Sequence, residues 1–189
     1  IARRLAEHGA KVILADMDLP SAQAVADDLC AKGCEAKALE FNVAEFEKIP
    51  EKVAQARALF GRIDILVNVA GIAGSTPIEE ITLVHMSSLA ALRGGRSSDA
   101  SYACAKAGIL NLSKCFALRG APYHITSNAV CPGNILTPMG KTLSWSKVDP
   151  KTYIPLGRYG TAEDIANAVL FYASDLSDYV TGDSMNVNG

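Results

Sequence analysis

The sequence lacks the features that mark several specialised classes of protein. No apolar run among its 189 residues is long enough to span a bilayer as a helix. No block of like charge occurs either, since 18 Lys and Arg residues are matched by 20 Asp and Glu residues. Nucleic acid and membrane are therefore not expected as partners. With 49% hydrophobic and only 6% aromatic residues, the composition predicts one globular domain, and we expect it in the cytoplasm.

Patterns for metal binding and disulfide bonding are also missing. The five cysteines include no C-x-x-C pair and have no histidine at ligand spacing, so a structural zinc site is not expected. Free thiols are typical of a reducing compartment. Because Cys104, Cys115 and Cys131 have apolar neighbours in the sequence, we expect all three to fill the core.

Strand and helix patterns alternate along the chain. Short apolar runs typical of buried strands occur at 11–16, 35–41, 62–71, 83–88, 124–133 and 184–189. Helical spacing occurs at 1–8, 21–33, 44–61, 101–119 and 162–173, and Pro50 predicts a break in the third of these segments. This order predicts an α/β fold over residues 1–189, a doubly wound, Rossmann-like parallel sheet in three layers.

Parallel sheets of this kind bind ligands at the carboxyl ends of their strands. An acidic residue, Asp16, ends the first strand, where a carboxylate can accept hydrogen bonds from ribose hydroxyls and repel a 2′-phosphate. Small or polar residues end the later strands: Asn68, Ala70, Gly71, Ser87, Ser88, Pro132 and Gly133. We therefore predict a binding site at this edge of the sheet.

A tyrosine and a lysine stand four residues apart in the stretch "SYACAKAG". On a helix, Tyr102 and Lys106 share one face. A phenol of ordinary pKa about 10 needs about 4 kcal/mol in favour of the phenolate to act as a base near neutral pH. One cation about 4 Å away supplies about that much at an effective dielectric constant of 20. The pair is thus chemically sufficient, although the same spacing is common on exposed helix faces.

Several segments together resemble the classical short-chain dehydrogenase/reductase family. They are "VILAD", "DILVNVAG", "VHMSS", "YACAK", "NAVCPGNILTP", "PLGRYGTAEDIANAVLFYAS" and "VTGDSMNVNG". The resemblance implies hydride transfer between a nicotinamide dinucleotide and an alcohol/carbonyl pair, without a metal. It also implies a homotetramer or homodimer in which the long helix packs against its mate.

The resemblance also implies a role for each catalytic residue. Tyr102 is the acid/base group, and Lys106 stabilises its phenolate and holds the nicotinamide ribose. Ser88 donates a hydrogen bond to the substrate oxygen. Ser87 is the second choice for this role, because the interval from Ser88 to Tyr102 is slightly longer than usual.

The cofactor residues follow from the same resemblance. Asp16 is expected at the adenosine ribose, Asn42 and Val43 at the adenine, and Ile135 and Thr137 at the carboxamide end of the nicotinamide. The complete expected set is Asp16, Asn42, Val43, Asn68, Ala70, Gly71, Tyr102, Lys106, Pro132, Gly133, Ile135 and Thr137. Because of Asp16, we expect NAD to be preferred over NADP.

Three departures from the family pattern are visible. The usual Asn-Asn-Ala-Gly is Asn68-Val69-Ala70-Gly71, and Asn42 stands where an acidic residue is frequent. The glycine-rich phosphate loop and its strand are absent before residue 1, and the 15 residues 68–82 are too few for a crossover helix. The relay asparagine of the family belongs to that second gap. We therefore expect a polypeptide longer than 189 residues, with further segments at its start and near Thr82–Leu83.

Three functions fit these patterns. The first is an NAD-dependent oxidoreductase of a small alcohol, polyol or ketone that uses Ser88, Tyr102 and Lys106. The second is a 3-oxoacyl-acyl-carrier-protein reductase, against which Asp16 argues because such enzymes usually favour the phosphorylated cofactor. The third is a non-catalytic binding protein of the same family. Trp145 and Tyr153 either line a substrate pocket or pack within a lid.

Overall fold

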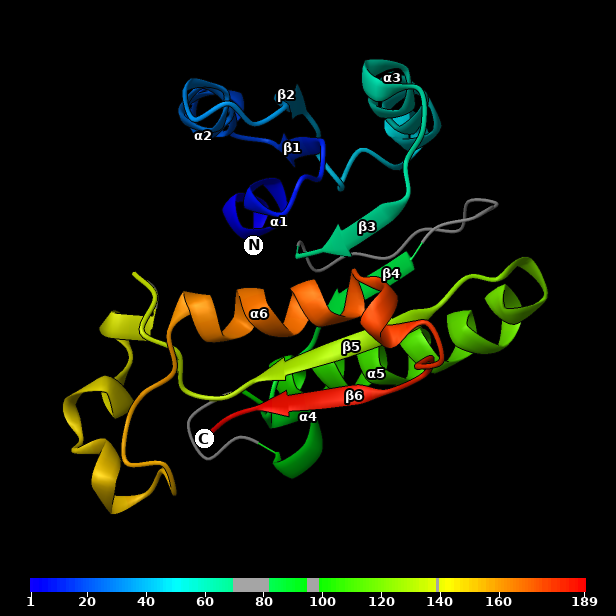
Figure 1. The fold of residues 1–189 in the computed structure, drawn as a ribbon. Coiled ribbons are helices and arrows are strands. Elements are labelled where there is room, and N and C mark those ends of the chain that lie inside the picture. Colours follow the sequence, from blue (N-terminus) through cyan, green and yellow to red (C-terminus); the bar gives the residue numbers. More distant parts are fainter. Residues whose placement is uncertain (70–81, 95–98, 139) are drawn as a thin grey trace. The chain divides into compact units, whose positions relative to one another are not determined.

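A computed structural model describes residues 1–69, 82–94, 99–138 and 140–189. Contacts between residues divide these into two units (Figure 1). The first unit holds Ile1–Asp64, and the second holds Ile65–Val69 with the described residues from Thr82 onward. Each unit is described by itself.

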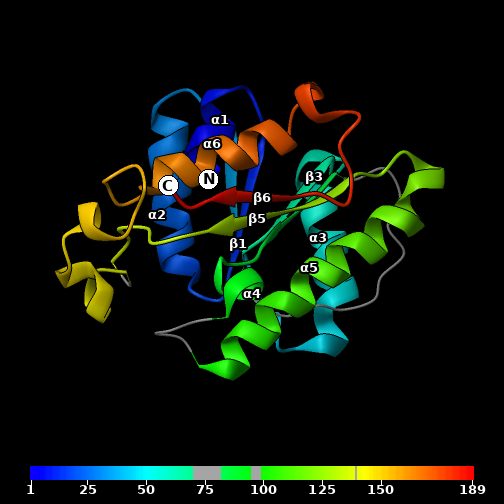
Figure 2. The same ribbon diagram turned by 90° about the horizontal axis from the view of Figure 1, so that it is seen from below.

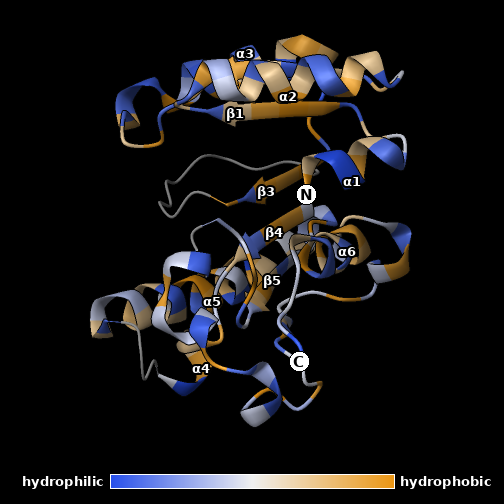
Figure 3. Ribbon diagram, turned by 90° about the vertical axis from the view of Figure 1, so that its left-hand side faces the viewer, coloured by the Kyte–Doolittle hydropathy of each residue, from blue (hydrophilic) through white to orange (hydrophobic). Residues whose placement is uncertain are grey.

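The first unit has two parallel strands covered by helices. Its elements are α1 (Ala2–Glu7), β1 (Val12–Asp16), α2 (Leu19–Ala31), β2 (Ala36–Glu40), the 3-10 helix η1 (Phe46–Lys48) and α3 (Ile49–Phe60). Strand β1 pairs with β2 so that Val12 lies opposite Ala36 and Asp16 opposite Glu40. Figure 3 shows the hydrophobic residues along β1. The core of this unit is Ala6, Ala26, Leu29 and Ala36.

Capping residues define where the helices of this unit begin. The side chain of Asp18 accepts a hydrogen bond of 3.1 Å from the Ser21 N–H and so caps α2. Pro20 and Pro50 lie in the first turns of α2 and α3, where a missing N–H costs nothing. The predicted break at Pro50 is therefore confirmed as the change from η1 to α3.

The second unit has a four-stranded parallel sheet in the order β3-β4-β5-β6. Its strands are β3 (Ile65–Asn68), β4 (Thr82–Met86), β5 (Ser127–Pro132) and β6 (Ser184–Val187). Its helices are α4 (Ala90–Arg93), α5 (Ala100–Gly120) and α6 (Ala162–Tyr172), with short 3-10 helices η2 (Ala121–Tyr123), η3 (Gly140–Thr142), η4 (Ser144–Lys147), η5 (Pro150–Thr152) and η6 (Asp175–Ser177). The segment that joins β3 to β4 falls mainly in 70–81, outside the described residues.

Helices α5 and α6 cover opposite faces of this sheet (Figure 2). Under α5, the buried residues Leu110, Ala129 and Cys131 form a hydrophobic cluster. On the other face, α6 begins with a capping box in which Thr161 and Asp164 accept hydrogen bonds from each other's backbone N–H. The expected α/β fold with parallel strands is thereby confirmed.

One expectation about the cysteines was wrong. Cys131 is buried, but Cys104 and Cys115 are exposed. Helix α5 presents Leu110, Ser113 and Ala117 to the core, and residues 104 and 115 fall on its outer side. In the described residues, no helix has the length and apolar character that crossing a membrane requires.

Candidate active site

The carboxyl ends of β1 and β2 bring three predicted residues together in the first unit. The Phe41 N–H donates a hydrogen bond of 2.9 Å to the Asp16 carbonyl, which sets the end of β2 beside the end of β1. The Oδ1 atom of Asp16 accepts from the Asp18 N–H at 3.0 Å, and the carboxylate is exposed. The Oδ1 atom of Asn42 accepts from the Ala44 N–H at 3.0 Å, so Asn42 and Val43 form a turn beside Asp16.

In the second unit, β4 and β5 end side by side. The Ser87 N–H donates to the Val130 carbonyl at 2.8 Å, and the Leu89 N–H donates to the Pro132 carbonyl at 2.9 Å. Gly133 follows at a point where a Cβ atom would lie 2.8 Å from the Cα of Asn188. Only glycine therefore allows this close approach of the two chain segments.

Helix α5 carries Tyr102 and Lys106 to the same strand end. The Nζ atom of Lys106 donates a hydrogen bond of 3.0 Å to the carbonyl of Met86, the last residue of β4. The same atom lies 5.8 Å from the centre of the Tyr102 ring. The Tyr102 side chain is 44% exposed, so its phenol is open to a ligand. The predicted pair is thus assembled at the end of β4.

The two neighbouring serines differ in what their hydroxyl groups do. Ser87 is only 4% exposed, and its hydroxyl donates to the Lys106 carbonyl at 2.8 Å. Ser88 is less buried, and its Oγ accepts a hydrogen bond of 3.2 Å from the Ala90 N–H. An acceptor role leaves the O–H of Ser88 available to a ligand, whereas the proton of Ser87 is already engaged. The geometry therefore favours Ser88 over Ser87 as the donor to a substrate oxygen.

The loop after β5 is held in a defined shape. Ile135 forms an isolated bridge with Gly160, and the Thr137 N–H donates to the Ile135 carbonyl at 2.8 Å. The Thr137 Oγ1 accepts from the Gly140 N–H at 3.0 Å. A Cβ atom at Gly140 would lie 2.2 Å from the Ile135 carbonyl oxygen, so this loop requires glycine there.

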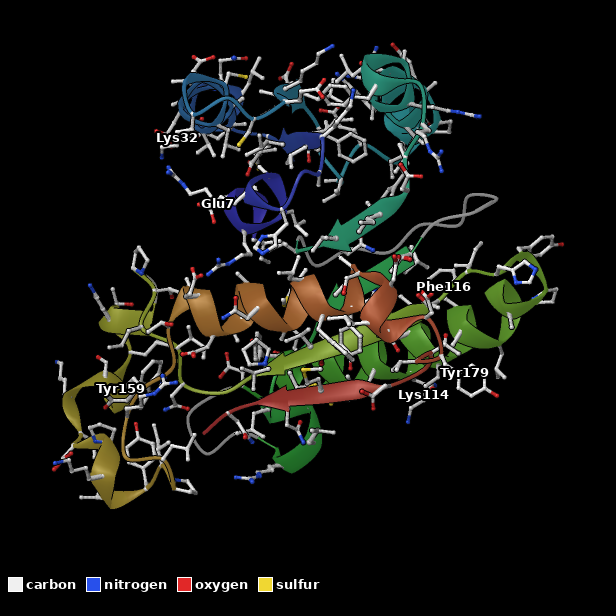
Figure 4. The ribbon with its side chains drawn as sticks, viewed as in Figure 1. Glu7, Lys32, Lys114, Phe116, Tyr159 and Tyr179 are labelled. Carbon is white, nitrogen blue, oxygen red and sulfur yellow. The ribbon has the colours of Figure 1, made fainter. Side chains whose placement is uncertain are left out.

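Residues 140–153 form a lid of three 3-10 helices beyond the carboxyl ends of β5 and β6 (Figure 1). The Tyr153 hydroxyl donates to the Trp145 carbonyl at 3.3 Å and accepts from the Asn134 amide at 3.2 Å. Tyr159, labelled in Figure 4, donates to the same carbonyl at 2.7 Å. Loss of hydration and the neighbouring Tyr153 raise the pKa of Tyr159 to about 12. Trp145 and Tyr153 are thus joined by a hydrogen bond within this segment, and Tyr153 remains 43% exposed.

Burial also shifts the pKa values of two groups beneath α5. His85 of β4 is 4% exposed and stacks on Phe116 of α5 (labelled in Figure 4), with ring centres 6.0 Å apart. Burial lowers the pKa of His85. Burial also raises the pKa of the Cys131 thiol. Both groups are therefore uncharged near neutral pH.

The predicted residues fall into three groups. Asp16, Asn42 and Val43 lie together in the first unit. The second unit holds Asn68, Ser88, Tyr102, Lys106, Pro132, Gly133, Ile135 and Thr137 at or near its strand ends. Ala70 and Gly71 lie outside the described residues.

Sequence reasoning did not find the contributions of Met86, Asn134 and Tyr159. Met86 acts through its backbone carbonyl, and Asn134 acts through a side chain in a loop. No residue pattern in the sequence predicts either contact. Among the residues that the structure describes, no group of three His, Cys, Asp or Glu side chains could hold a metal ion.

Two family models match the chain. The model described as short chain dehydrogenase matches residues 1–84, and the model described as Enoyl-(Acyl carrier protein) reductase matches residues 78–189. The 3-oxoacyl-(acyl-carrier-protein) reductase of Escherichia coli is 36% identical over 222 positions, covering 100% of this chain and 90% of the relative. Because this chain has 189 residues, 33 of those positions have no counterpart in it. The corresponding reductase of Aquifex aeolicus is 33% identical with the same coverage.

Solved structures agree with the family models. A short-chain dehydrogenase/reductase double variant of Serratia marcescens superposes with a TM-score of 0.87 at 28% identity, covering 100% of this chain and 90% of that one. A 3-ketoacyl-(acyl-carrier-protein) reductase of Brucella melitensis, complexed with NADH, gives 0.85 at 26% identity with the same coverage. This chain therefore belongs to the short-chain dehydrogenase/reductase family and is an oxidoreductase that acts on a carbonyl or hydroxyl group.

Proposed function

We propose that the chain is an NAD-dependent oxidoreductase that interconverts a small alcohol and its ketone through Ser88, Tyr102 and Lys106. The observation that carries this proposal is the position of the Lys106 ammonium, which the Met86 carbonyl holds 5.8 Å from the centre of the Tyr102 ring. A fixed cation beside a phenol at the carboxyl edge of a parallel sheet suits proton transfer to a bound substrate.

In the direction of reduction, the Tyr102 phenol gives its proton to the substrate oxygen, and the C–O bond order falls from two to one. The Ser88 hydroxyl donates a hydrogen bond to the same oxygen and stabilises its developing negative charge. The Lys106 ammonium stabilises the phenolate that remains. Lys106, Ile135 and Thr137 would hold the nicotinamide, which when bound would supply a hydride to the carbonyl carbon. The Tyr102 side chain is 44% exposed, so water can return the proton to it.

The residues for the dinucleotide are proposed in two sets. In the first unit, Asp16 receives the adenosine ribose, and Asn42 and Val43 border the adenine. In the second unit the set is Asn68, Tyr102, Lys106, Pro132, Gly133, Ile135 and Thr137. Ala70 and Gly71, which lie outside the described residues, complete the proposed set. Asp16 fits its role as a hydrogen-bond acceptor, because its carboxylate is exposed and only one oxygen is shown to accept from a backbone group, the Asp18 N–H. The other oxygen remains open to ribose hydroxyls, which supports NAD over NADP.

The second candidate is a 3-oxoacyl-acyl-carrier-protein reductase. Its support is the identity of 36% with the Escherichia coli reductase of that name. A Brucella melitensis reductase of this kind is complexed with NADH, so an acidic residue at position 16 does not by itself separate the two candidates. The preferred substrate therefore distinguishes the two candidate functions better than the preferred cofactor does.

Two measurements test the proposal against these rivals. Titration with NADH, followed by nicotinamide fluorescence, separates an enzyme from a non-catalytic binding protein that takes up no dinucleotide. Turnover of a panel of small ketones and of a 3-ketoacyl thioester then ranks the substrates. Preference for small ketones with NADH supports our proposal, whereas preference for the thioester puts the reductase first. No turnover with any of them would refute both.

Assembly and location are proposed on the family pattern. We expect a homotetramer or homodimer. Sedimentation velocity tests this, and a monomer would contradict it. All five cysteines are free thiols, which supports a reducing compartment such as the cytoplasm.

A further inference from the structure

Ser87 has no part in the proton transfer proposed above, yet it is bound more tightly into the site than Ser88. Its side chain is 4% exposed, and its hydroxyl donates to the carbonyl of Lys106 at 2.8 Å. In return, the ammonium of Lys106 donates to the carbonyl of Met86 at 3.0 Å. Two hydrogen bonds in opposite directions thus join residues 86 and 87 of one segment to residue 106 of α5.

This pair of bonds lies next to every proposed catalytic group. Ser88 is the residue after Ser87, and Tyr102 is one helical turn before Lys106, or about 6 Å along the helix axis. A shift of α5 along β4 would therefore move the phenol relative to the Ser88 hydroxyl. The lysine side chain is long and flexible and restrains such a shift poorly, whereas a serine side chain has a single rotatable bond before its oxygen.

A second buried serine in the same unit shows what a purely local role looks like. Ser177 is 2% exposed, and its hydroxyl donates to the carbonyls of Tyr172 and Ser174, each at 3.1 Å. Both bonds join residues at most five positions apart in the sequence. The Ser87 bond instead joins a strand end to Lys106 of α5, 19 residues away in the sequence. Both serines are buried and donate hydrogen bonds to backbone carbonyls. They differ in that only the Ser87 bond connects a strand end to a helix.

We propose that Ser87 is a positioning residue, which holds the Tyr102–Lys106 turn of α5 in register with Ser88 at the end of β4. This inference rests on the proposed function, because it assigns the catalytic roles to those three residues. Ser87 itself does not touch the substrate.

Steady-state kinetics of the full chain test the catalytic consequence. We expect Ser87→Ala to lower kcat about tenfold or more, because a small misplacement of reacting groups is costly. The KM of the ketone and the Kd of NADH should stay within about threefold, since the binding groups remain. Ser87→Thr, which keeps the hydroxyl, should recover most of kcat. Ser177→Ala should lower the melting temperature and leave kcat per folded molecule unchanged.

Hydrogen exchange read by mass spectrometry tests the restraint without any turnover. Ser87→Ala should speed exchange in peptides from the first half of α5, residues 100–110, and leave residues 111–120 unchanged. Ser177→Ala should change neither. Unchanged exchange in 100–110, or a kcat for Ser87→Ala within about twofold of the parent, would overturn the positioning role. If the parent protein is inactive but Ser87→Ala still exchanges faster in 100–110, the proposed function is refuted. The restraint of α5 by Ser87 would in that case still be supported.

Discussion

The Nζ atom of Lys106 lies 5.8 Å from the centre of the Tyr102 ring while it donates a hydrogen bond to the carbonyl of Met86. A strand-end carbonyl thus fixes a cation beside a phenol that remains accessible. Because both residues lie on α5 and their anchor lies on β4, the arrangement depends on how the helix packs against the sheet.

Tyr102→Phe should abolish most of the turnover and leave the rest of the protein intact. The phenylalanine ring keeps the packing of α5 but cannot carry a proton, so we expect kcat to fall by about 10²–10⁴-fold. The melting temperature and the Kd of NADH should be close to those of the parent. Stopped-time assays of reduced nicotinamide absorbance measure the effect, and substantial residual turnover would contradict the assignment.

Lys106→Ala should impair both turnover and dinucleotide binding. The ammonium is expected both to stabilise the phenolate and to hold the nicotinamide ribose, and a hydrogen bond from a charged group contributes about 1.5–3 kcal/mol. We therefore expect the Kd of NADH to rise about tenfold or more. Lys114→Ala is the matched control, because this exposed lysine lies on the same helix (Figure 4). An unchanged Kd for Lys106→Ala would disprove the dual role.

Asp16 should make the enzyme prefer NAD. The exposed carboxylate is expected to accept hydrogen bonds from ribose hydroxyls and to repel a 2′-phosphate, so kcat/KM should be higher for NAD than for NADP by about tenfold or more. Asp16→Asn keeps the acceptor for the Asp18 N–H and removes the charge, and it should raise kcat/KM for NADP. Asp27→Asn serves as a control on an exposed face of α2. A parent enzyme that favours NADP would place the acyl-carrier-protein reductase first.

His85 should make the protein less stable in mild acid. Burial lowers the pKa of His85 in the folded state, so the unfolded chain takes up a proton first as the pH falls below about 6.5. The free energy of unfolding should therefore decrease between about pH 7 and about pH 5. His85→Gln, whose amide can still reach the Ser127 hydroxyl now 3.2 Å from the imidazole, should show a smaller decrease.

Urea unfolding at the two pH values measures this difference. His8→Gln is the control, because His8 is exposed and its Nδ1 forms a hydrogen bond with the Arg4 carbonyl. Equal pH dependence in the parent and in His85→Gln would show that another group is responsible.

The order of strands and helices could be predicted because it depends on local patterns. Short apolar runs marked β1 and β5, and Pro50 marked the break between η1 and α3. The shared face of Tyr102 and Lys106 also followed from helix geometry alone. The extent of the lid could not be predicted from the sequence, because its three 3-10 helices have no apolar period. They are held by hydrogen bonds between the Trp145 carbonyl and two tyrosine hydroxyls.

The amino-acid sequence by itself determined the α/β order, the tyrosine–lysine pair and the positions of the strand ends, because each depends on residues close together in the chain. Only the tertiary structure decided which serine has a free hydroxyl and which cysteines are exposed. Ser87 is engaged by a carbonyl 19 residues away, and Cys104 and Cys115 lie outward because α5 docks through Leu110, Ser113 and Ala117. These outcomes depend on which face of a helix meets the sheet, and that choice is made by packing between elements distant in sequence.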